Sequence, residues 1–314
     1  MRNFMRPKII LSACLNLEPV RYDGGFVKDE FVLKLRDFCD INTVCPEVSI
    51  GLGVPREKII VYKTEEGYRI SQPSTGSDLT DIMYKFSEDF ISNLSNYEFD
   101  GAILKSKSPS CGVSNTLVYK DKEGKIYHSK GKGIFAMLLM EKFPLIPIED
   151  EGRLKNPDIK RNFLTRIFSL ADLREFRKNA KEVKEIMDFH QRYKYLLMTY
   201  SQEKLRKLGK IVANINRDNF KESLSIYSEI FLKALSKKPS RNQHYNTLSH
   251  IFGHISEKLR EKEKMHFLNL LKNYKEGKVE LKVILEILKN WVFRFDDEYL
   301  ITQAYLIPYP EELE

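Results

Sequence analysis

Three short apolar runs, each leading into a cysteine, constrain this chain more than any other feature of its sequence. The runs cover residues 7–13, 41–44 and 99–104, and the cysteines that follow them are Cys14, Cys45 and Cys111. Short apolar runs that alternate with helical patterns are typical of buried strands in a parallel sheet. The C-terminal ends of such strands meet at one edge, where open α/β sheets hold their ligands. We therefore expect each of three strand ends to present one thiol at that edge.

Between these runs, the first half of the chain alternates strand-like and helix-like segments, which predicts an α/β domain with a mostly parallel, Rossmann-like sheet over residues 1–150. Cys39 falls within an apolar stripe at helical spacing, so we interpret it as a core residue and not as a ligand. Helices are predicted over 28–39, 80–93 and 133–143, a further strand over 58–62, and a hairpin from 117–119 and 126–128.

The second half is helical. Residues 151–182 form a predicted linker that carries one helix, from 159 to about 176, and residues 183–314 form a predicted all-α bundle. Ser201 and Ser240 are expected to cap helices, because a serine hydroxyl can accept a hydrogen bond from a free backbone N–H of the first turn. Gly277 is expected in the turn between the last two long helices.

Charge is divided unevenly between the two halves. Residues 1–150 hold 20 Lys and Arg against 21 Asp and Glu, whereas residues 151–314 hold 32 against 23. Lysine-rich helix faces in contact with solvent are one explanation. An anionic partner such as RNA is the alternative.

The sequence predicts a cytoplasmic protein with no membrane segment. No run approaches the ~20 apolar residues that a membrane span needs. Residues 1–7 lack the apolar core of a signal peptide. Four cysteines without close, even spacing favour reduced thiols over a disulfide framework.

Three thiols at three strand ends leave several chemistries open. They suit a zinc site, redox or nucleophilic cysteines, or three ligands of an iron-sulfur cluster. Spacing does not choose among these, since the chain has no C-x-x-C motif. Proline and glycine next to Cys45 and Cys111 indicate tight loops with free N–H groups, and Lys105 and Lys107 are expected to favour the thiolate.

Five short motifs then carry a resemblance over residues 7 to about 150. They are SACL (12–15), VRYDG (20–24), CPEV (45–48), GLGVPR (51–56) and KSKSPSCG (105–112). In this order they resemble the thiouracil desulfidase family. The resemblance implies a 4Fe-4S cluster with one open iron, held by Cys14, Cys45 and Cys111. It also implies that Glu47 and Ser108 assist the reaction.

A second resemblance covers roughly residues 185–314. It rests on FHQRYKYLLM (189–198), YKEG (274–277) and the tyrosine- and proline-rich ending at 299–310. These segments look like a helical family of unknown function, the YbgA type, which is often fused behind the first family. This resemblance supports the two-domain architecture and implies nothing about chemistry.

The resulting hypothesis is an enzyme that removes sulfur from a thio-substituted pyrimidine such as thiouracil and yields the oxo-pyrimidine and sulfide. Glu47 is expected to transfer a proton, and Ser108 is expected to donate a hydrogen bond to the substrate or to orient the water. The substrate is a small thiopyrimidine, or a thio-modified nucleotide or RNA that the basic second half helps to bind. Two alternatives stay open: a zinc-dependent hydrolase with a three-cysteine site, and an RNA-binding protein with a structural metal.

Overall fold

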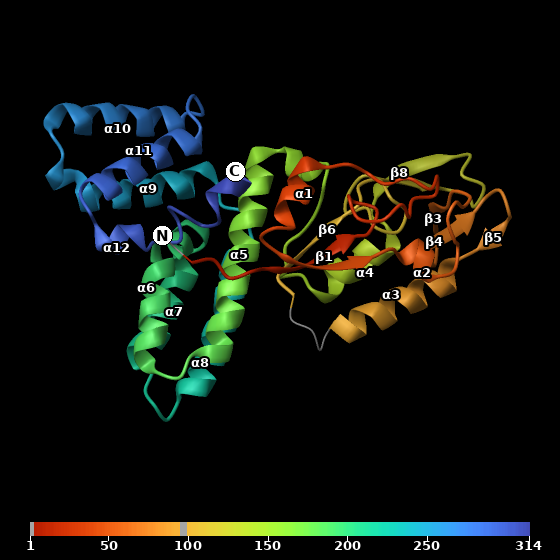
Figure 1. Cartoon of the computed structure of the whole chain (residues 1–314), viewed down its shortest axis with the longest axis horizontal. Coiled ribbons are helices and arrows are strands. Elements are labelled where there is room, and N and C mark those ends of the chain that lie inside the picture. Colours follow the sequence, from red (N-terminus) through yellow and green to blue (C-terminus); the bar gives the residue numbers. More distant parts are fainter. Residues whose placement is uncertain (1–2, 95–98) are drawn as a thin grey trace. The chain divides into compact units, whose positions relative to one another are not determined.

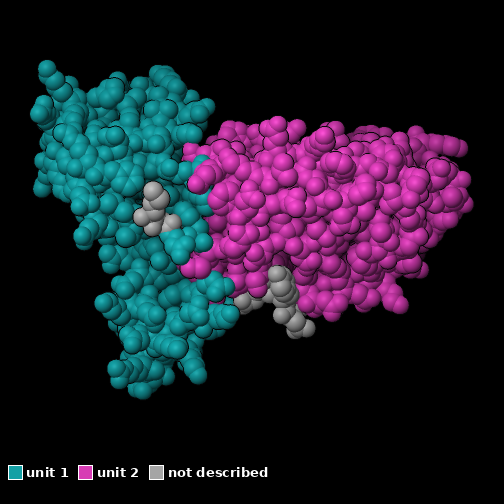
Figure 2. Space-filling view, in the orientation of Figure 1, with its two compact units in different colours: residues 1–4, 175–311 teal, residues 5–174, 312–314 magenta. Residues whose placement is uncertain are grey.

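The computed structural model describes residues 3–94 and 99–314, and it divides into two compact units (Figures 1 and 2). The first, the α/β unit, comprises residues 5–174 and 312–314. The second, the helical unit, is built on residues 175–311. The predicted combination of an α/β domain with an all-α domain is therefore confirmed.

A four-stranded parallel sheet forms the centre of the α/β unit (Figure 1). Its strands, in the order β2-β1-β6-β9, are β1 (Lys8–Ser12), β2 (Asp40–Val44), β6 (Gly101–Leu104) and β9 (Ile148–Asp150). All three pairings are parallel. The strand order changes direction between β1 and β6, which is the point where open α/β sheets form a ligand crevice.

A second, mixed sheet has the order β5-β4-β3-β7-β8. Its strands are β3 (Ile60–Thr64), β4 (Gly67–Gln72), β5 (Ser77–Asp78), β7 (Thr116–Tyr119) and β8 (Tyr127–Gly131). Strands β7 and β8 pair antiparallel and confirm the predicted hairpin. The antiparallel hairpin of β3 and β4 was not predicted, because the short, polar β4 lacks the apolar run that marks the parallel strands.

Helices of the α/β unit cover its sheets. The first four are α1 (Glu30–Leu35), α2 (Pro46–Ser49), α3 (Thr80–Leu94) and α4 (Ile134–Lys142). One face of the mixed sheet packs against α3 and α4 through a buried cluster that contains Val61, Ile70, Met83, Val118 and Ile134. The other face of this sheet is thereby left for the cavity described below.

The predicted helix over residues 28–39 was too long, because α1 ends at Leu35. The carbonyls of its last turn, those of Leu33, Lys34 and Leu35, accept hydrogen bonds from backbone N–H groups three residues further along. Such tight bonds satisfy the free carbonyls and end a helix. The segment that follows is held by the guanidinium of Arg6, which donates hydrogen bonds to the carbonyls of Asp37, at 2.7 Å, and Cys39, at 3.0 Å. Cys39 itself is buried in the core, as expected.

Helix α5 (Pro157–Asn179) is the one predicted for the linker, and its residues up to Arg174 belong to the α/β unit. Its buried side chains include Phe163, Leu164, Ile167, Phe168 and Leu170. Such burial is typical of a helix that covers a sheet. The domain boundaries drawn at residues 150 and 182 stay a prediction.

Seven helices make up the helical unit as far as the structure describes it: α6 (Val183–Tyr200), α7 (Gln202–Asn214), α8 (Phe220–Leu235), α9 (Arg241–Ile255), α10 (Glu261–Lys275), α11 (Leu281–Arg294) and α12 (Glu298–Ile301). The hydroxyls of Ser201 and Ser240 cap α7 and α9, as predicted. Gly277 has φ +83° and lies between α10 and α11, a conformation that favours glycine. In the described part of the chain, no helix combines the length and the hydropathy that a bilayer span requires.

Candidate active site

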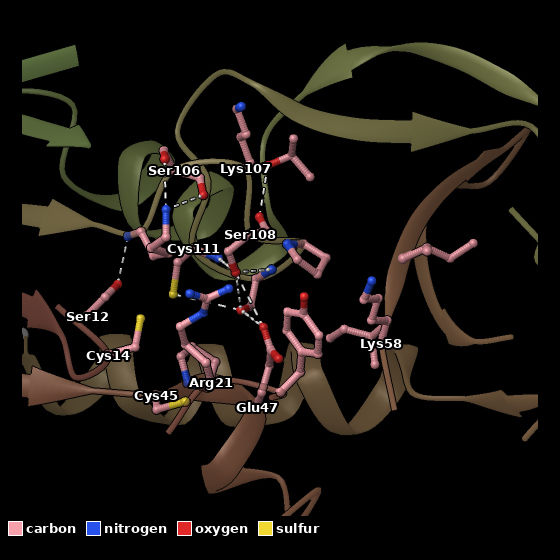
Figure 3. Close-up of a pocket in the computed structure, with 18 of the residues that line it drawn as sticks. Ser12, Cys14, Arg21, Cys45, Glu47, Lys58, Ser106, Lys107, Ser108 and Cys111 are labelled. Atoms are coloured by element: carbon pink, nitrogen blue, oxygen red, sulfur yellow. Dashed lines mark hydrogen bonds between the residues drawn. The ribbon is translucent and has the colours of Figure 1, made fainter. Parts of the chain in front are cut away.

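A cavity of about 770 Å³ lies at the C-terminal edge of the parallel sheet (Figure 3). Its wall comes partly from the segments that follow β1, β2 and β6, and partly from residues of β3, β7 and β8. The cavity thus lies between two surfaces. One is the edge of the parallel sheet where the three cysteines follow their strands, and the other is the face of the mixed sheet that α3 and α4 do not cover.

All three predicted cysteine ligands line this cavity. Cys14 follows β1 by two residues, Cys45 follows β2 directly, and Cys111 ends the loop after β6. Figure 3 shows the three thiols on the same side of the cavity. Parallel pairing of these strands brings the thiols together, although they are far apart in the sequence. Cys39 does not line the cavity.

Burial dominates the chemistry of the thiols. Together with a smaller contribution from the neighbouring Cys45, it raises the pKa of Cys14 to about 12. Burial likewise raises the pKa of Cys45 and of Cys111. The expectation that lysines favour the thiolate holds only in part. The charge of Lys105 lowers the pKa of Cys14, but desolvation of the thiolate outweighs this effect.

A buried carboxylate holds the loop after β6. Glu151, directly after β9, accepts hydrogen bonds from the Ser106 backbone N–H, at 2.8 Å, and the Ser106 hydroxyl, at 2.6 Å, and it forms an ion pair with Lys105. On the other side, the hydroxyl of Ser12 accepts a 2.9 Å hydrogen bond from the Lys105 backbone N–H. The ends of β1, β6 and β9 therefore fix the start of the loop together.

Ser108 shapes the part of this loop that carries Cys111. Its Oγ accepts hydrogen bonds from the backbone N–H groups of Ser110, at 3.2 Å, and Cys111, at 3.1 Å. Gly112 is required next, because a Cβ there would come within 2.0 Å of Thr116 Oγ1. Ser108 thus holds the loop as well as facing the cavity, whereas the sequence suggested only a role toward substrate.

Glu47 lies beside the thiols on α2, and its two oxygens have different partners (Figure 3). Oε1 accepts hydrogen bonds from the hydroxyls of Ser110, at 2.8 Å, and Ser108, at 3.3 Å. Oε2 accepts two from the guanidinium of Arg56, at 2.9 and 2.7 Å. The two residues predicted to assist the reaction are therefore in contact.

Sequence reasoning missed three contributors: Arg56, Ser110 and Glu151. The first two lie inside quoted motifs, but nothing in the motifs says that they meet Glu47. Glu151 directly follows a strand of the parallel sheet, as the cysteines follow theirs. That position could have predicted that Glu151 lies near the site.

Positive charge dominates the cavity wall. Glu47 is its only carboxylate among the described lining residues, whereas the lining cations are Arg21, Arg56, Lys58, Lys105, Lys107 and Lys130. Arg21, Arg56 and Lys105 are paired with carboxylates. The other three lysines form no ion pair with any described carboxylate; Lys58 instead lies over the ring of Tyr22, 4.9 Å from its centroid.

The donor set fits a group larger than one metal ion. In the parts of the chain that the structure describes, no three His, Cys, Asp or Glu side chains are arranged to hold a single ion. A 4Fe-4S cluster requires a wider arrangement, because each thiolate binds a different iron. Three thiols on three loops around one cavity meet that requirement.

Comparison with known proteins matches the two halves of the chain to two different families. Residues 9–151 match the 2-thiouracil desulfurase family, and residues 194–310 match a family described as a protein of unknown function (DUF1722). The uncharacterized protein YbgA of Escherichia coli (strain K12) is 28% identical over 148 residues, which cover 47% of this chain and 88% of that protein. The uncharacterized protein YbbK of Bacillus subtilis (strain 168) is 30% identical over 138 residues, which cover 42% of this chain and 89% of that protein.

Among solved structures, the 4Fe-4S-dependent thiouracil desulfidase TudS is similar, with 28% sequence identity and a TM-score of 0.40. The alignment covers 50% of this chain and 97% of that chain. The chain belongs to the 2-thiouracil desulfurase family through its α/β unit, and it joins to that unit a helical domain of the DUF1722 family.

Proposed function

We propose that the protein removes sulfur from a thio-substituted pyrimidine, with a 4Fe-4S cluster held by Cys14, Cys45 and Cys111. The observation that carries the proposal is the convergence of these three thiols with Glu47 in one cavity. The matching family and the name of the similar desulfidase structure support the same activity and cofactor.

The reaction replaces the C–S bond of the thiocarbonyl by a C–O bond from water and releases sulfide. When bound, the cluster would supply an open iron that attracts the soft sulfur and polarises the C–S bond as a Lewis acid. Glu47 takes a proton from the attacking water and returns one to the leaving sulfur or the ring nitrogen. Ser108 holds its hydroxyl toward Glu47 and orients the water.

A substrate that carries phosphate fits the cavity better than a free base does. Lys58, Lys107 and Lys130 line the cavity without a carboxylate partner among the described residues. Figure 3 shows Lys58 across the cavity from the three thiols. Cations placed there can bind the phosphate of a thio-modified nucleotide or RNA while the base reaches the cluster.

RNA is the larger substrate to test, because the excess of basic residues lies after residue 150. If the helical unit contributes phosphate contacts, the affinity for RNA falls as salt rises, since each neutralised phosphate releases counterions. Binding of RNA that does not depend on salt would remove this part of the proposal.

Anaerobic purification followed by iron and sulfide analysis tests the function. We expect brown protein with about four irons per chain when the cluster is complete, and release of sulfide from thiouracil and from thiouridine monophosphate. Colourless protein that contains zinc and hydrolyses other substrates would support the zinc hydrolase instead.

All four cysteines are free thiols, so the cytoplasm, a reducing compartment, is the location we propose.

A further inference from the structure

We propose that Arg56 and Ser110 are positioning residues that fix the carboxylate of Glu47, so that proton exchange takes place at Oε1 alone. The inference rests on the proposed function, in which Glu47 transfers protons. It adds two residues to the machinery and assigns the reaction to one of the two carboxylate oxygens.

Arg56 binds the second carboxylate oxygen of Glu47, Oε2. Its Nε and Nη2 both donate to Oε2 of Glu47, at 2.9 and 2.7 Å. Its Nη1 donates to the carbonyls of Val20, at 2.9 Å, and Gly53, at 3.1 Å, so the guanidinium is anchored on two sides. The side chains of Arg56 and Glu47 are only 4% and 13% exposed. Two charge-assisted donors that are held in place occupy the lone pairs of Oε2, whereas a hydroxyl that donates to Oε1 can rotate away and leave that oxygen open to a proton.

Ser110 aligns the remaining oxygen. It is 1% exposed, and its hydroxyl contacts Oε1 of Glu47 at 2.8 Å, closer than the 3.3 Å of Ser108. The two serine hydroxyls are 3.0 Å apart, and Ser110 Oγ lies 3.8 Å from the thiol of Cys111. Oε1 is therefore held toward the thiols by hydroxyl groups, which can pass a proton on, whereas the guanidinium at Oε2 cannot give one up.

This arrangement predicts a loss of rate when either partner is removed. A carboxylate held at one oxygen only can rotate, and small misplacements of a reacting group are costly to the rate. Lysine at position 56 would keep the charge but lose the planar fork that binds one oxygen twice. Serine at position 110 can be shortened to alanine without adding any atom to a buried site.

The test uses Arg56→Lys and Ser110→Ala in the full chain, each alone and combined with Glu47→Gln. We expect kcat to fall ~10- to 100-fold in each single variant, as for a misplaced group. KM, iron content and sulfide content should stay close to the wild type. In the Glu47→Gln background, neither change should lower kcat further, because residues that act as one unit are not additive.

Arg174→Lys is the matched control. Arg174 and Asp100 form another buried arginine–carboxylate pair of the α/β unit, with side chains 9% and 3% exposed, and neither lines the cavity. This variant should lower the melting temperature and keep the wild-type kcat. A readout apart from activity is binding of methylguanidinium, measured by calorimetry, which should be seen with Arg56→Ala and not with the wild type.

The outcomes separate the two proposals. Wild-type protein with a full cluster that releases no sulfide overturns the proposed function. Active wild type together with wild-type kcat in both Arg56→Lys and Ser110→Ala overturns the positioning roles. Loss of iron in both variants, or a further loss of kcat in the Glu47→Gln background, assigns the two residues to the structure of the site and also overturns the inference.

Discussion

Gly101, the first residue of β6, lies against Ile167 of α5, so closely that a Cβ on Gly101 would come within 2.6 Å of Ile167 Cγ2. The same Cβ would meet the Pro147 carbonyl oxygen at 3.2 Å. The parallel sheet therefore uses α5 as a cover, and the absence of a side chain at position 101 permits this close approach. A helix that the sequence places in a linker is part of the core around the site.

Shortening the chain tests this role. A chain that ends after Glu151 loses α5 and exposes the sheet, whereas one that ends after Asn179 keeps the helix. We expect the shorter chain to aggregate or to unfold at a much lower urea concentration. The longer chain should bind iron and release sulfide from a free thiobase. Equal stability of the two, measured by circular dichroism, would show that α5 is a linker only.

The three cavity cysteines are expected to act together on the cluster. Changing Cys14, Cys45 or Cys111 to Ala should abolish the brown colour and most of the iron, because three thiolates are needed to hold the group. Cys39→Ala is the control, since Cys39 is buried away from the cavity. It should cost some stability and leave iron content unchanged. Bleaching by Cys39→Ala, but not by Cys45→Ala, would mean that the ligands are assigned wrongly.

Glu47 is expected to matter for turnover and not for assembly of the cluster. Glu47→Gln keeps the shape of the side chain and removes its ability to take a proton. The iron content should be unchanged, and kcat should fall by ~10²- to 10⁴-fold, the usual contribution of a positioned acid-base group. Steady-state sulfide release measures this. A fully active variant would be incompatible with proton transfer by Glu47.

Glu151 is expected to stabilise the loop that carries Cys111. Glu151→Gln removes the negative charge that Lys105 and Ser106 share. The free energy of unfolding should fall by ~1.5–3 kcal/mol, the range for hydrogen bonds to a charged group. Glu149→Gln, two residues earlier, is the control, because its partner Arg153 is 40% exposed and such pairs contribute little. If urea denaturation showed that Glu151→Gln and Glu149→Gln lower the free energy of unfolding equally, the stabilising role of Glu151 would be contradicted.

The helical unit should lose stability in mild acid. Burial, with a smaller contribution from the positive charge of Lys194, lowers the pKa of His190 from 6.5 to about 4. The unfolded chain then binds the proton more tightly than the folded chain does. Stability present above pH 6.5 is therefore lost as the pH falls toward 4, by ~2–3 kcal/mol in full.

Fluorescence of Trp291, the only tryptophan of the chain, reports on this unit because it lies in α11. In urea denaturation, the free energy of unfolding should differ less between pH 7 and pH 5 for His190→Gln than for the wild type. Glutamine at this position can still contact the Tyr227 hydroxyl, which lies 3.1 Å from His190 Nδ1. The same pH dependence in both proteins would show that His190 is not the group responsible.

The sequence by itself determined the features that depend on near neighbours along the chain. Apolar runs marked β1, β2 and β6, and serines at the ends of apolar helical patterns marked the caps of α7 and α9. These signals are reliable because a strand or a cap is decided by backbone preferences within a few residues. The rule that ligands lie at the C-terminal edge of parallel strands then brought Cys14, Cys45 and Cys111 to one place.

Only the tertiary structure decided what surrounds those thiols. Arg56 and Ser110 reach Glu47 from different loops, and Glu151 reaches Lys105 because β9 lies next to β6. The strand order sets these contacts, and no local pattern encodes it. Burial likewise outweighs the expected effect of Lys105 on the thiol of Cys14, because desolvation depends on everything packed around a group and not on its neighbours in the sequence.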